Sequence, residues 1–151
     1  MELDHFLASC HSIYALFHPI GTNIHGLLTN FYGPQLPDQN SSFLHFLQWL
    51  LLDQPHPMDV IGGDFNIITL LQDKWEGRQL LSEEDKLFKR FINSNNMVNF
   101  NTNNGTHTWN NHRGKASQIA FKLDCFLISE HIMLRNDEIN ATILPATGSN
   151  H

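Results

Sequence analysis

Residues 58–66, which read Met-Asp-Val-Ile-Gly-Gly-Asp-Phe-Asn, constrain the fold of this chain more than any other stretch. Val60 and Ile61 are β-branched and stand beside turn-forming residues, a pattern typical of a strand that is covered on both faces. The glycine pair has no Cβ atoms, so backbone or ligand can approach closely where the strand ends. Side-chain alternation places Asp64 and Asn66 on one face. This carboxylate and amide can orient a water and hold a phosphate oxygen, although a turn closed by an Asx cap has the same residues.

Composition limits the class of protein. The chain has 151 residues, enough for one domain with a sizeable core, and 41% of them are hydrophobic. The formal net charge of -6 argues against a strongly basic nucleic-acid-binding module. It does not exclude a nuclease, because a local groove and bound cations can offset an acidic total. Cys10 and Cys125 form no motif and, without a signal-peptide pattern, indicate reduced thiols in an intracellular protein. No segment has the length of a membrane span.

Hydrophobic periodicity and turn residues predict helices and strands in mixed order. Besides the strand through Val60, the expected strands are residues 12–17, 24–32, 106–110, 121–128 and 139–144. One helix is expected over residues 41–53, with a buried stripe formed by Phe43, Phe46, Leu47, Leu50 and Leu51. A second helix is expected to begin at a capping box at Ser82, with an apolar face formed by Leu87, Phe88, Phe91 and Ile92. This mixture indicates an α/β sandwich rather than a regular βαβ array.

Five separated segments match one known pattern. They are residues 30–34 (Asn-Phe-Tyr-Gly-Pro), 62–66 (Gly-Gly-Asp-Phe-Asn), 108–109 (Thr-Trp), 122–129 (Lys-Leu-Asp-Cys-Phe-Leu-Ile-Ser) and 148–151 (Gly-Ser-Asn-His). Together they resemble the endonuclease/exonuclease/phosphatase superfamily, and most closely the endonuclease domain of LINE-type retrotransposons abundant in plant genomes. The resemblance implies an α/β (α+β) sandwich of the deoxyribonuclease-I-like type, with an incomplete two-sheet core flanked by helices. Residues 1–151 would be a single partial domain in which residues 1–11 match poorly.

The resemblance also implies catalytic roles for the matching residues. Asp64 would orient or deprotonate the attacking water, and Asn66 would bind a phosphate oxygen beside it. Tyr32 would lie near the scissile phosphate. Asp124 would orient the catalytic His151, because a carboxylate fixes the imidazole tautomer and supports its charged form while phosphate charge develops.

Substrate, metal and partners follow from the same resemblance. Asn30 and Trp109 would bind substrate, Trp109 as a stacking residue, although a tryptophan of this kind is also a common core residue. The implied cofactor is Mg²⁺, the implied partner is DNA, and the implied location is the nucleus, with no membrane and no obligate protein partner. The metal position corresponds to Asn150, whose amide is a poorer Mg²⁺ ligand than the family's Asp.

The chain departs from the family pattern at both ends. The opening strands and the Glu that anchors Mg²⁺ in the family have no match, and Glu2 and Asp4 lack the context to replace that Glu. We therefore expect a fragment of a retroelement hydrolase with weak or no phosphodiesterase activity. Two alternatives stay open: a non-catalytic remnant that binds nucleic acid weakly, and a phosphatase for small phosphoesters. The pairs His107 with His112 and Cys10 with His11 do not have the spacing of a zinc site.

Overall fold

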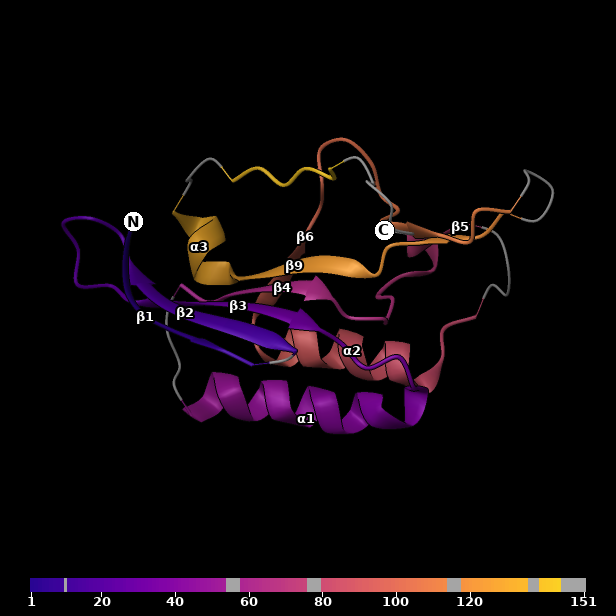
Figure 1. The fold of residues 1–151 in the computed structure, drawn as a ribbon, viewed down its shortest axis with the longest axis horizontal. Coiled ribbons are helices and arrows are strands. Elements are labelled where there is room, and N and C mark those ends of the chain that lie inside the picture. Colours follow the sequence, from indigo (N-terminus) through magenta and orange to yellow (C-terminus); the bar gives the residue numbers. More distant parts are fainter. Residues whose placement is uncertain (10, 54–57, 76–79, 114–117, 136–138, 145–151) are drawn as a thin grey trace.

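The computed structural model describes residues 1–9, 11–53, 58–75, 80–113, 118–135 and 139–144 (Figure 1). Six strands form the main sheet, in the spatial order β1 (Glu2–Ala8), β2 (Ser12–His18), β3 (Gly26–Tyr32), β4 (Val60–Asp64), β9 (Asp124–Ser129) and β6 (Met97–Phe100). Three short strands form a second sheet, in the order β5 (Lys74–Trp75), β8 (Ala120–Phe121) and β7 (Trp109–Asn110). The helices are α1 (Pro37–Asp53), the 3-10 helix η1 (Leu71–Asp73), α2 (Glu83–Ser94) and α3 (Glu130–Leu134). Two sheets with flanking helices confirm the predicted fold class.

The strand β4 is central, as its sequence predicts. It pairs in parallel with β3 and antiparallel with β9, so it has a neighbour on each side. Figure 1 shows α1 and α2 on one face of the main sheet, and α3 with the small sheet on the other. Ile61 packs into the larger core cluster together with residues of α1 and α2, whereas Val60 packs into a second cluster with Ile132 of α3. Both faces of β4 are therefore covered by apolar side chains at this point.

The helix α1 differs from the prediction in its start and in two positions of its buried stripe, Leu44 and Phe46. It begins at Pro37 rather than at residue 41, because proline lacks only an N–H that is unpaired in the first helical turn anyway. Leu44, Leu47 and Leu51 form its buried stripe. Phe46, predicted to be buried, is 40% exposed, since the leucine stripe rotates it to the border of the contact, where it stacks on Trp49.

The capping box predicted for the second helix is confirmed. The Ser82 hydroxyl accepts a hydrogen bond from the Asp85 N–H, and the Asp85 carboxylate accepts one from the Ser82 N–H. Phe88 and Phe91 are buried, together with Ile92. Leu87 was predicted on the same face but is exposed, because the buried Phe88 and Phe91 define a face from which it is rotated away.

The remaining strand predictions need correction. Of residues 106–110 only Trp109–Asn110 forms a strand, and residues 121–128 are split into β8 and β9. The split occurs because Lys122 donates its N–H to the Asp73 carbonyl and leaves the ladder. Residues 139–144 form no strand; their backbone bonds with the 103–104 turn instead. Conversely β1, in the segment 1–11 that matched the family poorly, and β6 were not predicted.

Candidate active site at the carboxyl end of β4

Three adjacent strands place Tyr32, Asp64 and Asp124 side by side. Tyr32 is the register partner of Asp64 in the parallel β3–β4 pair, and Asp124 is its partner in the antiparallel β4–β9 pair. Partners in a ladder point to the same face of a sheet, and here it is the face opposite α1 and α2. Residues separated by up to 92 positions therefore meet in one row, which the sequence pattern alone does not determine.

The glycine at position 63 permits this close approach. Its φ of +134° is a conformation that L side chains rarely adopt, and a Cβ there would lie 2.0 Å from the Phe31 carbonyl oxygen. The backbone of β4 can thus run against β3 up to the last residue of the strand. The expectation that the glycine pair serves a close backbone approach is confirmed for Gly63, and this approach sets Asp64 beside Tyr32.

A hydrogen-bonded turn follows Asp64 and fixes its carboxylate. The Asn66 N–H donates to Asp64 Oδ1 at 2.9 Å, and Asn66 itself has a left-handed φ of 53°. The Asn66 Nδ2 donates to the Gly33 carbonyl at 3.1 Å, while the Gly33 N–H donates to the Asp64 carbonyl at 2.6 Å. The Asx turn that the sequence allows is therefore present. The turn is compatible with a catalytic role for Asp64, because it holds the Asp64 side chain, which is 7% exposed, in one orientation.

Asp124 is held by the segment before β7. The Thr108 hydroxyl accepts hydrogen bonds from the N–H groups of Leu123 and Asp124, at 3.1 and 3.0 Å. Asp124 also lines a hollow of about 200 Å³ together with Thr108 and Phe126. Two carboxylates that face each other across an antiparallel pair repel, so a cation beside Asp64 and Asp124 would be stabilised there.

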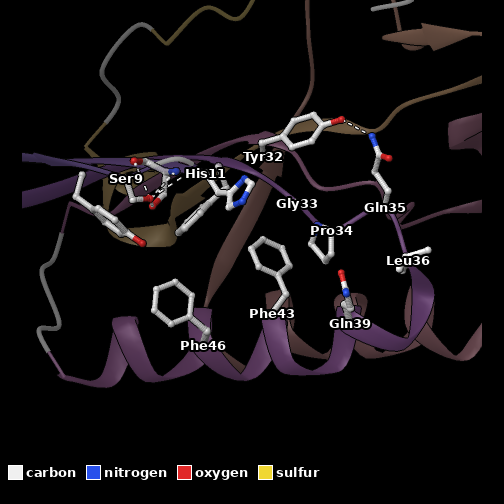
Figure 2. A pocket seen from close by; sticks show the side chains of 13 residues that line it. Ser9, His11, Tyr32, Gly33, Pro34, Gln35, Leu36, Gln39, Phe43 and Phe46 are labelled. Atoms are coloured by element: carbon white, nitrogen blue, oxygen red, sulfur yellow. Dashed lines mark hydrogen bonds between the residues drawn. The ribbon is translucent and has the colours of Figure 1, made fainter.

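Tyr32 lies at the rim of a different, mainly apolar hollow. Figure 2 shows Phe43 and Phe46 rising from α1 into this space of about 760 Å³, whereas the Tyr32 ring is directed away from the helix. The Tyr32 hydroxyl accepts a hydrogen bond from Gln35 Nε2 at 2.6 Å, and its side chain is 49% exposed. Neither Asp64 nor Asp124 lines this hollow, so Tyr32 is the one member of the row that borders it.

Trp109 and Asn66 line a third hollow of about 410 Å³. The Trp109 ring stacks on Phe121 with a centroid distance of 5.5 Å and an interplanar angle of 20°. The Trp109 side chain is half-buried, so part of it is exposed to solvent while the rest packs against the protein. Asn30 is exposed and lies two residues before Tyr32 on the same face. Tyr32, Asn66 and Asp124 thus lie near one end of the sheet but line three separate hollows.

Two predicted site residues cannot be placed. His151 and Asn150 lie outside the described residues, as does Cys10. The pairing of Asp124 with His151 and the metal role of Asn150 therefore stay predictions.

A buried polar network beside Asp124 was missed in the sequence. Lys122 is buried and donates from Nζ to the side chains of Asn99 and Asn101, at 3.4 and 3.1 Å. Asn99 in turn donates to the Thr69 hydroxyl, which donates to buried Asp73 at 2.7 Å. The sequence could have indicated this network, because a lysine next to an apolar strand is costly to bury without hydrogen-bond partners. This network anchors the chain two residues before Asp124.

The arrangement of the two sheets and helices is a deoxyribonuclease-I-like fold, and solved structures share it. The chain superposes on the endonuclease domain of TRAS1, a telomere-specific non-LTR retrotransposon, with a TM-score of 0.64 and 15% identity, covering 87% of this chain and 57% of that one. For the 3'-5' exonuclease NExo from Neisseria meningitidis the TM-score is 0.55 and the identity 16%, with 86% and 60% covered. For the AP endonuclease LMAP from Leishmania major the values are 0.56 and 17%, with 80% and 46% covered.

These three proteins are members of the endonuclease/exonuclease/phosphatase superfamily. At identities this low the likeness shows the shared fold, and the chain spans less than two thirds of the length of each. No protein-family model matches the sequence, and no curated protein matches it. Among the described residues, no helix combines the length and the apolar character needed to cross a bilayer.

Proposed function

We propose that this chain is a nuclease-type phosphodiesterase of retroelement origin that hydrolyses the DNA backbone slowly. The observation that carries the proposal is the row of Tyr32, Asp64 and Asp124 on three neighbouring strands. It places an aromatic hydroxyl and two carboxylates at one end of a deoxyribonuclease-I-like sheet. The plant LINE-type origin and a nuclear location are part of this proposal and rest on the sequence motifs.

The donor set fits Mg²⁺. Asp124 would provide a hard carboxylate oxygen, the ligand type that Mg²⁺ prefers, and its register partner Asp64 would add negative charge beside the ion. Bound there, the ion would supply charge neutralisation at the phosphate and a more acidic water.

Each side chain of the site has its own role in the proposed reaction. Asp64 accepts the proton of the attacking water, held in orientation by the Asn66 N–H. Asn66 uses one amide N–H for the Gly33 carbonyl and has a second for a phosphate oxygen. Asp124 orients His151, which supports the charge that develops on the phosphate. One face of the Trp109 ring stacks on Phe121, and a base would stack on the other face.

We infer a low rate because Asn150 carries no charge. An amide stabilises a cation, or the charge of a phosphate transition state, less than the carboxylate expected at this position. The superposed part also covers only 57% of the TRAS1 domain, so the full activity of any longer protein is a separate question.

Nicking of supercoiled plasmid by the purified chain tests the proposal. We expect slow nicking with Mg²⁺, none with EDTA, and a loss of about a hundredfold or more in Asp64→Asn. Asp38→Asn is the matched control, because Asp38 is an exposed carboxylate in the first turn of α1. Equal nicking by both variants would refute the role of Asp64. Release of phosphate from a small phosphoester without nicking would favour the phosphatase alternative, and inactivity on both substrates the non-catalytic one.

A further inference from the structure

A second polar cluster lies at the opposite end of β3. The Nδ1 atom of His18 is 3.0 Å from Oδ1 of Asp4, and Nδ1 of His25 is 3.3 Å from Oδ2 of the same carboxylate. One potential ligand atom from each of the three residues lies within 4.8 Å of the others. Asp4, His18 and His25 are called the Asp4 cluster below.

A β-bulge aims Asp4 at the two imidazoles. The register between β1 and β2 shifts between Leu3 and His5, so Asp4 is the extra residue of an antiparallel pair. Bulges re-aim a side chain out of the regular alternation of a strand. The turn between β2 and β3 then returns the chain so that the rings of His18 and His25 lie 5.7 Å apart at an angle of 62°. Three backbone segments thus converge on one carboxylate.

The spacings fit a tetrahedral zinc ion. Bonds of about 2.0–2.1 Å place two tetrahedral ligands roughly 3.3 Å apart. The Oδ2 atom of Asp4 lies 3.2 Å from Nδ1 of His18 and 3.3 Å from Nδ1 of His25, and both separations are close to such edges. A set of two imidazoles and one carboxylate favours Zn²⁺ over Mg²⁺, which prefers oxygen ligands in an octahedron.

Glu2 supplies an independent indication. Its Oε2 atom lies 3.0 Å from Nε2 of His18, on the other side of the ring from Asp4. Metal-binding histidines commonly donate their second ring N–H to a carboxylate, which fixes the tautomer that presents a lone pair to the metal.

We propose that Asp4, His18 and His25 bind a Zn²⁺ ion, with Glu2 orienting His18 and a fourth position taken by water. The ion joins β1, at the edge of the main sheet, to the end of β2 and to the residue before β3. Because the ion would bind the folded state alone, it would stabilise that state. The six steps along β3 to Tyr32 separate it by about 20 Å from the candidate active site, so it does not depend on the proposed nuclease activity.

Calorimetric titration of the chelator-treated chain with ZnCl2 tests this site. We expect one Zn²⁺ per chain, an affinity at least about a hundredfold lower in His18→Ala and in His25→Ala, and about tenfold lower in Glu2→Gln. His5→Ala is the matched control, an exposed histidine on the same strand outside the cluster, and should bind like the unmodified chain. Zn²⁺ should raise the Tm of the unmodified chain and of His5→Ala, but not of His18→Ala.

Cobalt gives a second readout. Co²⁺ bound to the unmodified chain should show the intense visible absorption of a tetrahedral site, and Asp4→Asn, which keeps the shape of the side chain, should lose it. Far-UV circular dichroism checks that each variant is folded. If an alanine variant does not fold, Asp4→Asn and Glu2→Gln replace it in the titration. The proposal is refuted if Zn²⁺ does not bind, if Co²⁺ gives only the weak octahedral spectrum, or if all the variants bind like His5→Ala.

Discussion

The two ends of β3 carry polar clusters of different construction. At the carboxyl end, Asp64 is buried and its orientation is set by a turn and by a glycine that no other residue can replace without strain. At the amino end, the Asp4 cluster is partly exposed and is assembled by a bulge on the edge strand β1 and by the turn between β2 and β3. The donor atoms also differ: oxygens at one end, and imidazole nitrogens with one carboxylate at the other. The difference teaches that one strand can present two polar clusters of different chemistry when its two ends are framed by different neighbours.

Replacing the acidic residue at each end should give the largest change in function. Asp124→Asn should lower plasmid nicking by about tenfold or more, because Asp124 no longer orients the imidazole, and should leave the Zn²⁺ affinity within about twofold. Asp4→Asn should do the reverse. Parallel nicking assays and zinc titrations check both variants. If either change affects both readouts equally, the two ends are not independent.

Glycine substitutions sharpen the contrast in rigidity. Gly63→Ala should destabilise the fold by at least about 3 kcal/mol, because its Cβ would collide with the Phe31 carbonyl and its φ is strained for alanine. Gly21→Ala, in the turn between His18 and His25, should cost only about 1 kcal/mol, since its φ of +79° is strained but its surroundings are open. Urea unfolding of the two variants measures the difference. Similar losses would show that the carboxyl end is no more tightly packed than the amino end.

Two threonines provide a smaller, matched test. Thr108→Val leaves the N–H groups of Leu123 and Asp124 without their acceptor and should cost about 1–2 kcal/mol. Thr22→Val, in the turn between β2 and β3, removes the hydrogen bond that the Thr22 hydroxyl donates to the Pro19 carbonyl and the longer one that it accepts from the Ile24 N–H. It should cost roughly 0.5–1 kcal/mol. Thermal unfolding compares them. A larger loss at Thr22 would contradict the ranking of the two ends.

The smallest effect is expected at Cys125, which lies on β9 one residue after Asp124. Burial raises the pKa of this thiol to about 12. Because a thiol is protonated below its pKa, almost no thiolate exists at pH 8, and iodoacetamide should leave Cys125 unmodified in the folded chain. Peptide mapping by mass spectrometry checks this, with the urea-unfolded chain as the positive control. Rapid labelling of Cys125 in the native protein would contradict this prediction and would show that β9 opens readily.

The most local features were the most predictable. The capping box at Ser82 and the β-branched run with glycines before Asp64 are complete within a few residues, so propensity and spacing specify them. Phe46 and Leu87 were assigned to the wrong side of their helices because the phase of a helix on a sheet depends on which side chains fill the interface. The 121–128 segment was taken as one strand because its break at Lys122 depends on a distant partner, the Asp73 carbonyl.

The sequence by itself determined the strand, glycine pair and polar turn of residues 58–66, and the motifs that indicate the nuclease-like fold. Only the tertiary structure decided that Asp64 and Asp124 are register partners, because strand pairing is a long-range contact that no local pattern encodes. The Asp4 cluster shows the same limit more strongly. Asp4, His18 and His25 have no motif spacing, and they meet only because a bulge and a turn bring three segments of the chain together.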